Sequence, residues 1–397
     1  MFNSWYKKFS SQPHQPFFVS GIIFLILFIY LLLLTYSNIL LVDNSLLEYH
    51  AYTMIYVVFI QFFLGFLFVV FPRFLMQAEI KPDVYMKQFL FYFISSIGIL
   101  ISLAFSSSLY VLFIIILFLT QIYSFIILYS IHKKSVMKEK NDTKWVLIFF
   151  FCGLVSHFLF ILSLINFQYA YLIKQLSINA GFYLFVFGII FTISQRMIPF
   201  FSSMKIQGYK INKSNKLLEV LFILLVLKVI ILTFNDVRFN LISDVPLFIL
   251  FTREIFKWKL PVFKTVAIMW ILFVSLYWIP FAFLISIIES ISAIFNTGLV
   301  FEKVVIHTIS LGYFVTVLIG FGTRVVLGHS GQTPHADKFT IILFVAIQFI
   351  AFLRIFASFS LNFNFDYLFF INLTAILLIV GLVLWSSKYL IILISGK

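Results

Sequence analysis

The sequence has few charged residues. Asp, Glu, Lys and Arg together make up 11% of its 397 residues, whereas a soluble domain carries roughly 25%. Hydrophobic residues make up 63%, and 56 residues are Phe. A water-soluble fold cannot hide that much apolar surface, because apolar residues normally amount to roughly 45–50%. The composition therefore predicts a protein whose main partner is a lipid bilayer.

Cysteine and the common catalytic motifs are scarce as well. The single cysteine, Cys152, lies inside an apolar run, which excludes a disulfide framework and a CxxC metal site. The sequence contains no Walker A loop, no GxGxxG after a strand, no HExxH and no serine or cysteine nucleophile motif. These absences argue against hydrolysis and against transport driven by nucleotides.

Twelve apolar runs are long enough to be predicted as transmembrane helices. Such a helix needs about 20 apolar residues, and lipid requires its backbone hydrogen bonds to close within it. The first run is too long for a signal-peptide core, so we interpret it as a retained helix. No linker or repeat separates the runs, which predicts one all-α transmembrane domain over residues 1–397. The predicted spans are 17–41, 46–71, 85–107, 109–131, 145–166, 176–201, 217–234, 240–256, 265–288, 304–328, 339–358 and 366–393.

The positive charge is distributed unevenly between the loops. The formal net charge of +14 would suggest nucleic acid in a soluble protein. In the twelve-span arrangement, however, 23 of the 28 Lys and Arg residues fall on one side, 3 on the other and 2 within spans. Because positive residues stay in the cytoplasm, both termini are predicted to be cytoplasmic. We expect no nucleic-acid partner.

Three histidines lie within predicted spans and in the same external half of the membrane. They are His50, His157 and His307. Neutral imidazole is a usual ligand of haem or copper, so the three could share a site if their helices are neighbours. The alternative is that each forms an isolated hydrogen bond between helices. His14 and His132 fall in basic stretches and are expected to be solvated.

The tenth predicted helix carries a row of mostly small residues at i+4 spacing. Such a row lets a partner helix or a flat ligand approach the backbone. Arg324, the arginine in this row, either extends its side chain to the membrane interface or pairs with an anion such as a haem propionate. His329 lies about 33 Å along the helix from His307, so the two cannot share a metal. A second polar site with His335 and Asp337, or a solvated loop, is expected there. The row is Thr308, Gly312, Thr316, Gly320, Arg324 and Gly328.

Further cations lie near or within the spans. Arg196 precedes Pro199 by three residues, which predicts a helix that is kinked or ends on the cytoplasmic side. Lys228 and Arg354 lie nearer the middle of their spans. Each needs a partner, such as Asp244 or Glu254, or a water-filled cavity.

Three segments resemble one known family. TRVVLGHSG at 323–331 is the most specific, QRMIPFF at 195–201 supports it, and so does HAYTMIYVVFIQFFLGFLFVVFPRF at 50–74. Together they resemble the NnrS family of haem- and copper-containing membrane proteins, which are linked to nitric oxide response and denitrification. The resemblance spans most of the chain and includes the family's twelve spans.

The resemblance implies a haem protein of the bacterial inner membrane that acts in nitrosative stress. It implies b-type haem, and also copper, held by His50, His157 and His307 in some pairing, with His329 as a further candidate. Arg196, Arg324 and Arg354 are implied to neutralise propionates or to line a proton path. Where the family has a second histidine and a glutamate, this chain has Tyr52 and Thr53. Tyr52 is expected to donate a hydrogen bond or a proton.

Two other functions stay open at this stage. A secondary transporter without haem would use Lys228 and Arg354 in a substrate cavity. A redox enzyme would turn nitric oxide over with an electron donor, whereas a sensor or a protective protein would only bind it. Ligands alone do not separate binding from turnover, because both depend on the groups around the metal.

Overall fold

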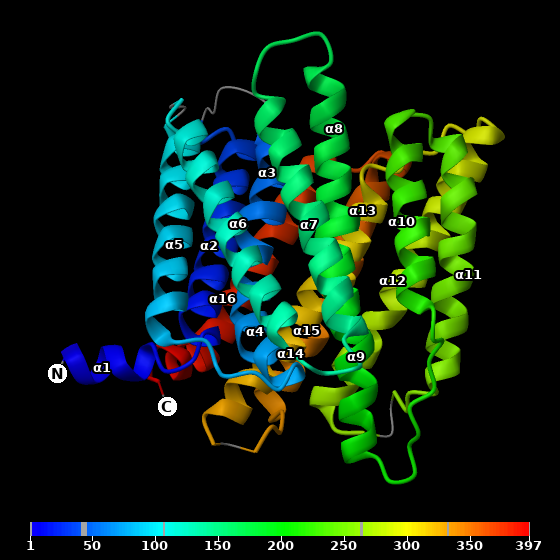
Figure 1. Ribbon diagram of the computed structural model, residues 1–397. Helices are drawn as coiled ribbons and strands as arrows, with labels where there is room; N and C mark the ends of the chain where they lie inside the picture. Colours follow the sequence, from blue (N-terminus) through cyan, green and yellow to red (C-terminus); the bar gives the residue numbers. More distant parts are fainter. Residues whose placement is uncertain (1, 41–45, 106–107, 263–264, 332, 397) are drawn as a thin grey trace. The chain divides into compact units, whose positions relative to one another are not determined.

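All regular structure in the described part of the chain is helical. The computed structural model describes residues 2–40, 46–105, 108–262, 265–331 and 333–396 (Figure 1). Within these ranges, ten helices are long and apolar enough to cross a membrane. The predicted all-α membrane fold is confirmed to that extent. The chain divides into two compact units, residues 1–192 with 386–397, and residues 193–385.

The first unit contains the N-terminal helices and the last turns of the chain. Trp5 Nε1 on α1 donates a hydrogen bond to the carbonyl of Ile394 over 2.9 Å, so α1 lies against the end of α16. Figure 1 shows α1 running crosswise to α2 and α5. The helices of this unit are α1 (Phe2–Phe9), α2 (His14–Tyr36), α3 (Leu46–Tyr52), η1 (Thr53–Val58), α4 (Phe59–Phe74), α5 (Pro82–Ala104), α6 (Tyr110–Lys134), α7 (Asn141–Leu162), α8 (Ala170–Ala180) and η2 (Gly181–Phe187).

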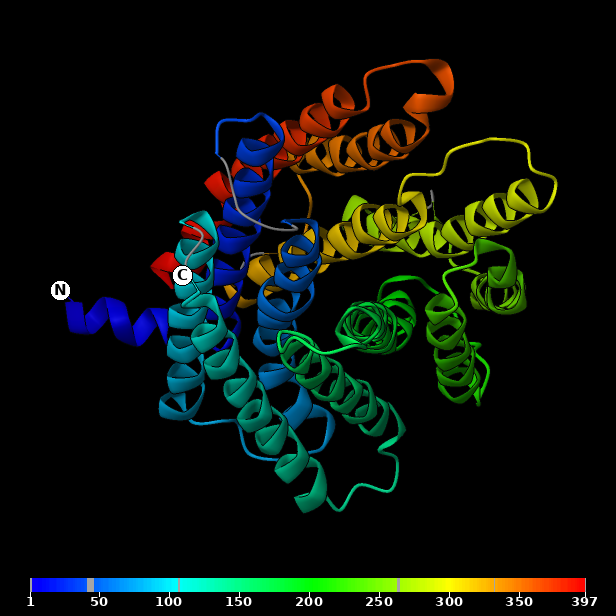
Figure 2. The ribbon, with the colours of Figure 1, turned by 90° about the horizontal axis from the view of Figure 1, so that it is seen from above.

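The second unit begins within α9 (Gly188–Lys205) and ends within α16 (Tyr367–Ser395). Seen from above, α10 and α11 are neighbours, and α15 runs beside the first part of α16 (Figure 2). Its other helices are α10 (Leu217–Thr233), η3 (Val237–Asn240), α11 (Leu241–Trp258), α12 (Ala267–Ile294), α13 (Val304–His307), η4 (Thr308–Val315), α14 (Thr316–His329), α15 (Lys338–Phe359) and η5 (Ser360–Phe363).

Ten of the twelve predicted spans correspond, within the described residues, to helices long and apolar enough to cross a membrane. The other two, predicted at 217–234 and 240–256, also form helices, α10 and α11, and whether these cross stays a prediction. α10 has 17 residues, and α11 has 18 and carries both acidic and basic side chains. The predicted span ends at 41 and at 106–107 lie outside the described residues. The cytoplasmic placement of both termini stays a prediction.

One helix continues where the sequence suggested an end. α9 runs to Lys205 with Pro199 inside it, so of the two predicted alternatives, a kink or an end near Pro199, the end is excluded. A proline removes one backbone donor, yet membrane helices tolerate it when neighbouring groups satisfy the freed carbonyl.

Three of the candidate spans contain a π-helical segment, and these are the most buried ones. The segments are η1, η2 and η4. The spans around them are buried over 83%, 72% and 72% of their most apolar stretch, the highest values among the ten. π-Helical turns are rare and are often found at functional sites. These helices are therefore the place to look for one.

The π-containing helices recur in a fixed order along the chain. Each follows one helix (α2, α7 or α12) and precedes two more (α5 and α6, α10 and α11, or α15 and α16). Each π-helical segment holds a buried tyrosine: Tyr56, Tyr183 or Tyr313. His50 and His307 both lie six residues before the tyrosine of their own helix, and Ser177 holds that position in the middle one. This four-helix repeat was missed in the sequence because few other residues coincide.

Candidate functional site

His157 is the most buried of the predicted histidine ligands. It lies on α7 with 0% of its surface exposed. Its Nε2 lies 2.9 Å from the Tyr52 hydroxyl on α3, and its Nδ1 lies 2.7 Å from Oε1 of Gln121 on α6. Both ring nitrogens therefore have a protein partner within the first unit.

The amide of Gln121 fixes the protonation of this imidazole. Gln121 Nε2 donates to the backbone carbonyl of Tyr56 over 2.9 Å, so its Oε1 faces His157 and can only accept. His157 must then carry its proton on Nδ1, which leaves Nε2 to accept from the Tyr52 hydroxyl. The hydrogen bonds thus run in one direction, from Tyr52 through His157 and Gln121 to the Tyr56 carbonyl.

Aromatic rings enclose this hydrogen-bonded chain. The Tyr56 ring stacks on the His157 imidazole with centroids 4.5 Å apart and planes 20° apart. Phe118 meets the same imidazole edge-on at 5.2 Å. A side chain at position 181 would overlap the Tyr56 hydroxyl, so Gly181 is what lets η1 and η2 approach closely. The site is consequently dry and tightly packed.

His50 lies in the same unit, at the end of α3 and just before η1. It is half-buried and comes two residues before Tyr52. The predicted three-histidine set thus divides between the units, because His307 belongs to the second.

His307 carries the same tautomer as His157. Its Nδ1 lies 2.9 Å from the carbonyl of Lys303, which can only accept, so Nδ1 is protonated. Its Nε2 lies 3.4 Å from Nη2 of Arg354, which can only donate. Arg354 also donates to Ser358 Oγ over 2.6 Å and is 7% exposed. Arg354 thus contacts an imidazole and a serine, two neutral partners beyond those that the sequence suggested, which were Asp244, Glu254 or a water-filled cavity.

Lys228 has the partner that the sequence suggested for it. Its Nζ lies 2.8 Å from Oδ2 of Asp244 on α11, with the two side chains 2% and 0% exposed. Ser286 on α12 donates to the same carboxylate over 2.5 Å, and Ser243 donates to its other oxygen over 3.1 Å. The prediction of Asp244 is confirmed. Glu254 instead accepts from Ser214 and from Trp258.

The small-residue row of α13, η4 and α14 packs against α12. A side chain at Gly312 would overlap the Trp278 ring, and one at Gly320 would meet Leu272. Thr316 accepts a hydrogen bond from Gln348 on α15 over 2.9 Å. Of the two predicted uses of this row, helix packing is the one observed at these positions.

Of the other predicted arginines, Arg324 lies near the far end of this row on α14, and Arg196 lies on α9. The Arg324 guanidinium lies over the Phe201 ring at 3.8 Å, a cation–π contact. Arg196 is half-buried on α9, the helix that carries Phe201.

The predicted second polar site has the character of a surface loop. His329 and His335 are exposed, and Asp337 caps α15 by accepting from the backbone N–H of Thr340 over 3.1 Å. Among the described residues, no group of three or more His, Cys, Asp or Glu is placed to hold a metal ion.

Of the two histidines expected to be solvated, one is buried and the other is half-buried. His14 was expected to be solvated but is 2% exposed, because the whole first turn of α2 is packed inside the first unit. His132 is half-buried near the end of α6, with Nδ1 3.1 Å from the Thr143 hydroxyl. The expectation is wrong for His14.

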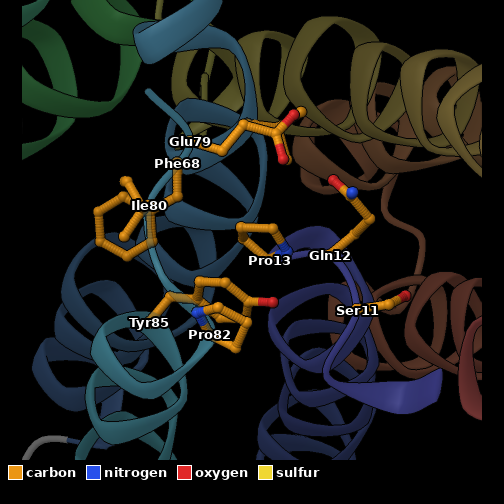
Figure 3. A pocket seen from close by; sticks show the side chains of 9 residues that line it. Ser11, Gln12, Pro13, Phe68, Glu79, Ile80, Pro82 and Tyr85 are labelled. Carbon is orange, nitrogen blue, oxygen red and sulfur yellow. The ribbon is translucent and has the colours of Figure 1, made fainter. Parts of the chain in front are cut away.

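A cavity of about 340 Å³, counted with the solvent that opens into it, lies among the starts of α2 and α5 and the loop before α5. Figure 3 shows the Tyr85 ring beside Pro82, with its hydroxyl turned toward the chain at Pro13. That hydroxyl donates to the Ser10 carbonyl. None of the predicted site residues lines this cavity.

Comparison with known proteins identifies the family. Residues 8–397 match the sequence model of the NnrS protein family. The chain belongs to the NnrS family. A comparison with curated proteins gives no match. The family resemblance seen in the sequence is thereby confirmed over nearly the whole chain.

This NnrS-family protein has functional candidates that sequence reasoning overlooked. Gln121 and Tyr56 hold His157 in place, and neither was predicted. A signal for Gln121 was present, since it is a neutral polar residue within the apolar α6 span, where such residues usually bond to another helix. Tyr56 gave no signal, because tyrosines are frequent in this chain.

Proposed function

We propose that this NnrS-family protein binds b-type haem in the bacterial inner membrane and acts in the response to nitric oxide. Family membership supports the nitric oxide response. The observation that carries haem binding is the tautomer of His307, with Nδ1–H anchored on a backbone carbonyl and Nε2 turned away from it. Metal-ligating histidines typically donate their other N–H to a carbonyl or a carboxylate in this way.

The donor chemistry at His307 fits a haem. A neutral imidazole with an accepting Nε2 is the form that binds iron. Arg354, whose guanidinium lies 3.4 Å from that nitrogen, is a natural partner for a propionate. His50, at the equivalent place in its own helix, is the corresponding candidate in the first unit. Bound haem supplies an open coordination position for a diatomic ligand such as nitric oxide.

The fit is poorer at His157. Its Nδ1–H is anchored on Gln121 as a ligand's would be, but Tyr52 already occupies the position in front of Nε2. Iron binding there would require Tyr52 to move, just as it would require Arg354 to move away from Nε2 of His307, but the contact in front of His157 is shorter, at 2.9 Å against 3.4 Å. The proposal therefore rests on His307 and His50, with copper as a second metal to be sought in the same preparation.

The visible spectrum of protein purified after haem-replete expression tests this proposal. We expect a Soret band that shifts when nitric oxide is added without oxygen. His307→Ala and His50→Ala are expected to lose or shift the band, and His132→Ala, a half-buried histidine hydrogen-bonded to Thr143, to keep it. A wild-type protein without a Soret band contradicts the proposal, as does equal behaviour of the three variants.

The spectrum does not distinguish binding from turnover. Steady-state loss of nitric oxide in the presence of a chemical electron donor indicates an enzyme, and stoichiometric binding indicates a sensor or a protective protein. A transporter receives less support, since the buried Lys228 is already paired with Asp244.

A further inference from the structure

We propose that Tyr52 and His157 form a redox-active pair in which Tyr52 loses one electron while its hydroxyl proton moves to His157. This goes beyond haem binding: the redox use of the pair rests on the proposed function, because a bound metal would be the oxidant, whereas the proton transfer rests on this chain's own residues. The observation that carries it is the directed chain of hydrogen bonds from the Tyr52 hydroxyl to the Tyr56 carbonyl.

A buried phenol cannot release its proton to water. Tyr52 is 0% exposed, so oxidation there needs a base within hydrogen-bond reach. His157 Nε2 is such a base, because it lies 2.9 Å away and its proton is held on the other nitrogen. An unprotonated nitrogen thus faces the phenol in the resting state.

The surroundings also accommodate the imidazolium that would form. Gln121 Oε1, 2.7 Å from Nδ1, accepts a stronger hydrogen bond once the ring is charged. The Tyr56 ring lies stacked on the imidazole, where its π face attracts a cation. The surrounding aromatic rings keep the proton between the Tyr52 hydroxyl oxygen and His157 Nε2. It can therefore return to Tyr52 when Tyr52 is reduced again.

The step balances with a one-electron oxidant. The O–H bond of Tyr52 breaks, an N–H bond forms at His157 Nε2, and the electron reduces the oxidant by one unit, leaving a neutral phenoxyl and an imidazolium. In the protein, the oxidant would be a bound metal centre, such as the haem of the proposed function, one electron above its resting state. In the test it is a photogenerated ruthenium(III) polypyridyl complex.

Three other buried tyrosines each have a hydroxyl or a carbonyl oxygen as a hydrogen-bond partner. Tyr92 Oη lies 3.4 Å from the Ser124 hydroxyl. Tyr313 donates to the Ser194 hydroxyl over 3.0 Å, and Tyr56 donates to the Ser177 carbonyl over 3.1 Å. Neither a hydroxyl nor a carbonyl takes up a proton near neutral pH. Tyr92→Phe is therefore a matched control for Tyr52→Phe, because each removes one buried hydroxyl from a ring that stays.

The experiment uses the full chain in detergent or nanodiscs, with and without haem. Flash oxidation by the ruthenium complex is followed by freeze-quenching and electron paramagnetic resonance. We expect a tyrosyl signal with a strongly coupled exchangeable proton in wild type and in Tyr92→Phe, in addition to that of exposed tyrosines, and loss of this component in Tyr52→Phe. In His157→Gln the signal should form about a hundredfold more slowly, the lower range for loss of a positioned base. Between pH 6 and 8 the wild-type rate should stay flat, because the proton remains inside.

Several results would overturn the pairing. They are absence of the proton-coupled component in wild type, its persistence in Tyr52→Phe, and its equal loss in Tyr92→Phe. If the variants fail to fold, hyperfine spectroscopy of the wild-type radical in H₂O and D₂O decides the matter. A strongly coupled exchangeable proton supports the pair, and its absence contradicts it. Since the haem-free sample is measured as well, failure of haem binding leaves this test intact.

Discussion

The first unit buries a neutral hydrogen-bonded chain, whereas the second buries an ion pair. Tyr52, His157 and Gln121 are uncharged, and each accepts or donates so that the next one is satisfied. Lys228 and Asp244 carry opposite charges 2.8 Å apart in an equally dry place. A neutral chain can shift a proton and take it back, because the imidazolium that forms is stabilised by Gln121 Oε1 and by the Tyr56 ring. An ion pair cannot lose one partner at little cost, because the remaining charge is then buried and unpaired.

This difference predicts unequal costs when each network is broken. Removing an acceptor from a neutral network leaves one unsatisfied donor, and removing an acid from a buried ion pair leaves an unsatisfied ion. The neutral chain is therefore suited to chemistry and the ion pair to fixing α10 against α11. Substitutions in the ion pair, in the neutral chain and at the surface should therefore differ in their cost to stability, from the largest to the smallest.

The largest effect is expected from Asp244→Ala. It leaves the Lys228 ammonium buried and unpaired, which costs about 3–5 kcal/mol of unfolding free energy when a buried pair is broken. Denaturant unfolding of the purified protein, followed by tryptophan fluorescence, measures the loss. The double variant Lys228→Met with Asp244→Leu should recover most of it, because apolar pairs of similar volume are tolerated. A single variant as stable as wild type contradicts the ionic reading of this network.

A smaller effect is expected from Gln121→Leu. It removes the acceptor of His157 Nδ1–H and the donor to the Tyr56 carbonyl, and an unsatisfied buried group costs about 1–3 kcal/mol. Thermal unfolding compares it with Gln77→Leu, whose side chain makes only long contacts with neighbouring carbonyls outside the spans. If Gln121→Leu is as costly as Asp244→Ala, the distinction between the two networks fails.

The sequence predicted the elements of these networks better than their partners. Apolar runs located the helices because each run must close its own backbone hydrogen bonds in lipid. The sequence also pointed to Asp244 as the partner of Lys228, because a buried cation requires an acidic partner. It did not lead to Gln121 or Tyr56 for His157, because an uncharged histidine accepts many partners. The choice among them depends on which helix faces which.

The π-helical segments are a second feature that could not be predicted from the sequence. Gly181 and Gly312 lie in η2 and η4, where each accepts a large ring from a neighbouring helix. Glycines in an apolar span predict close packing of some kind. They do not show that the helix widens there, because the same residues are compatible with ordinary α-helical turns. The equivalence of His50 and His307 became visible only through these segments.

The smallest effect on stability is expected from Asp236→Asn, which removes a charge at the surface. Asp236 and Arg238 form a salt bridge at the surface, with Nη2 and Oδ2 2.7 Å apart. Hydrogen bonds from Arg238 hold the pKa of the Asp236 carboxyl below its usual range, so any stability it adds is present at neutral pH and lost as acid protonates it. Water competes for both groups, so Asp236→Asn should leave the thermal midpoint at neutral pH unchanged. If Asp236→Asn instead lowered that midpoint as far as Asp244→Ala does, charge rather than burial would explain the contrast between the two units.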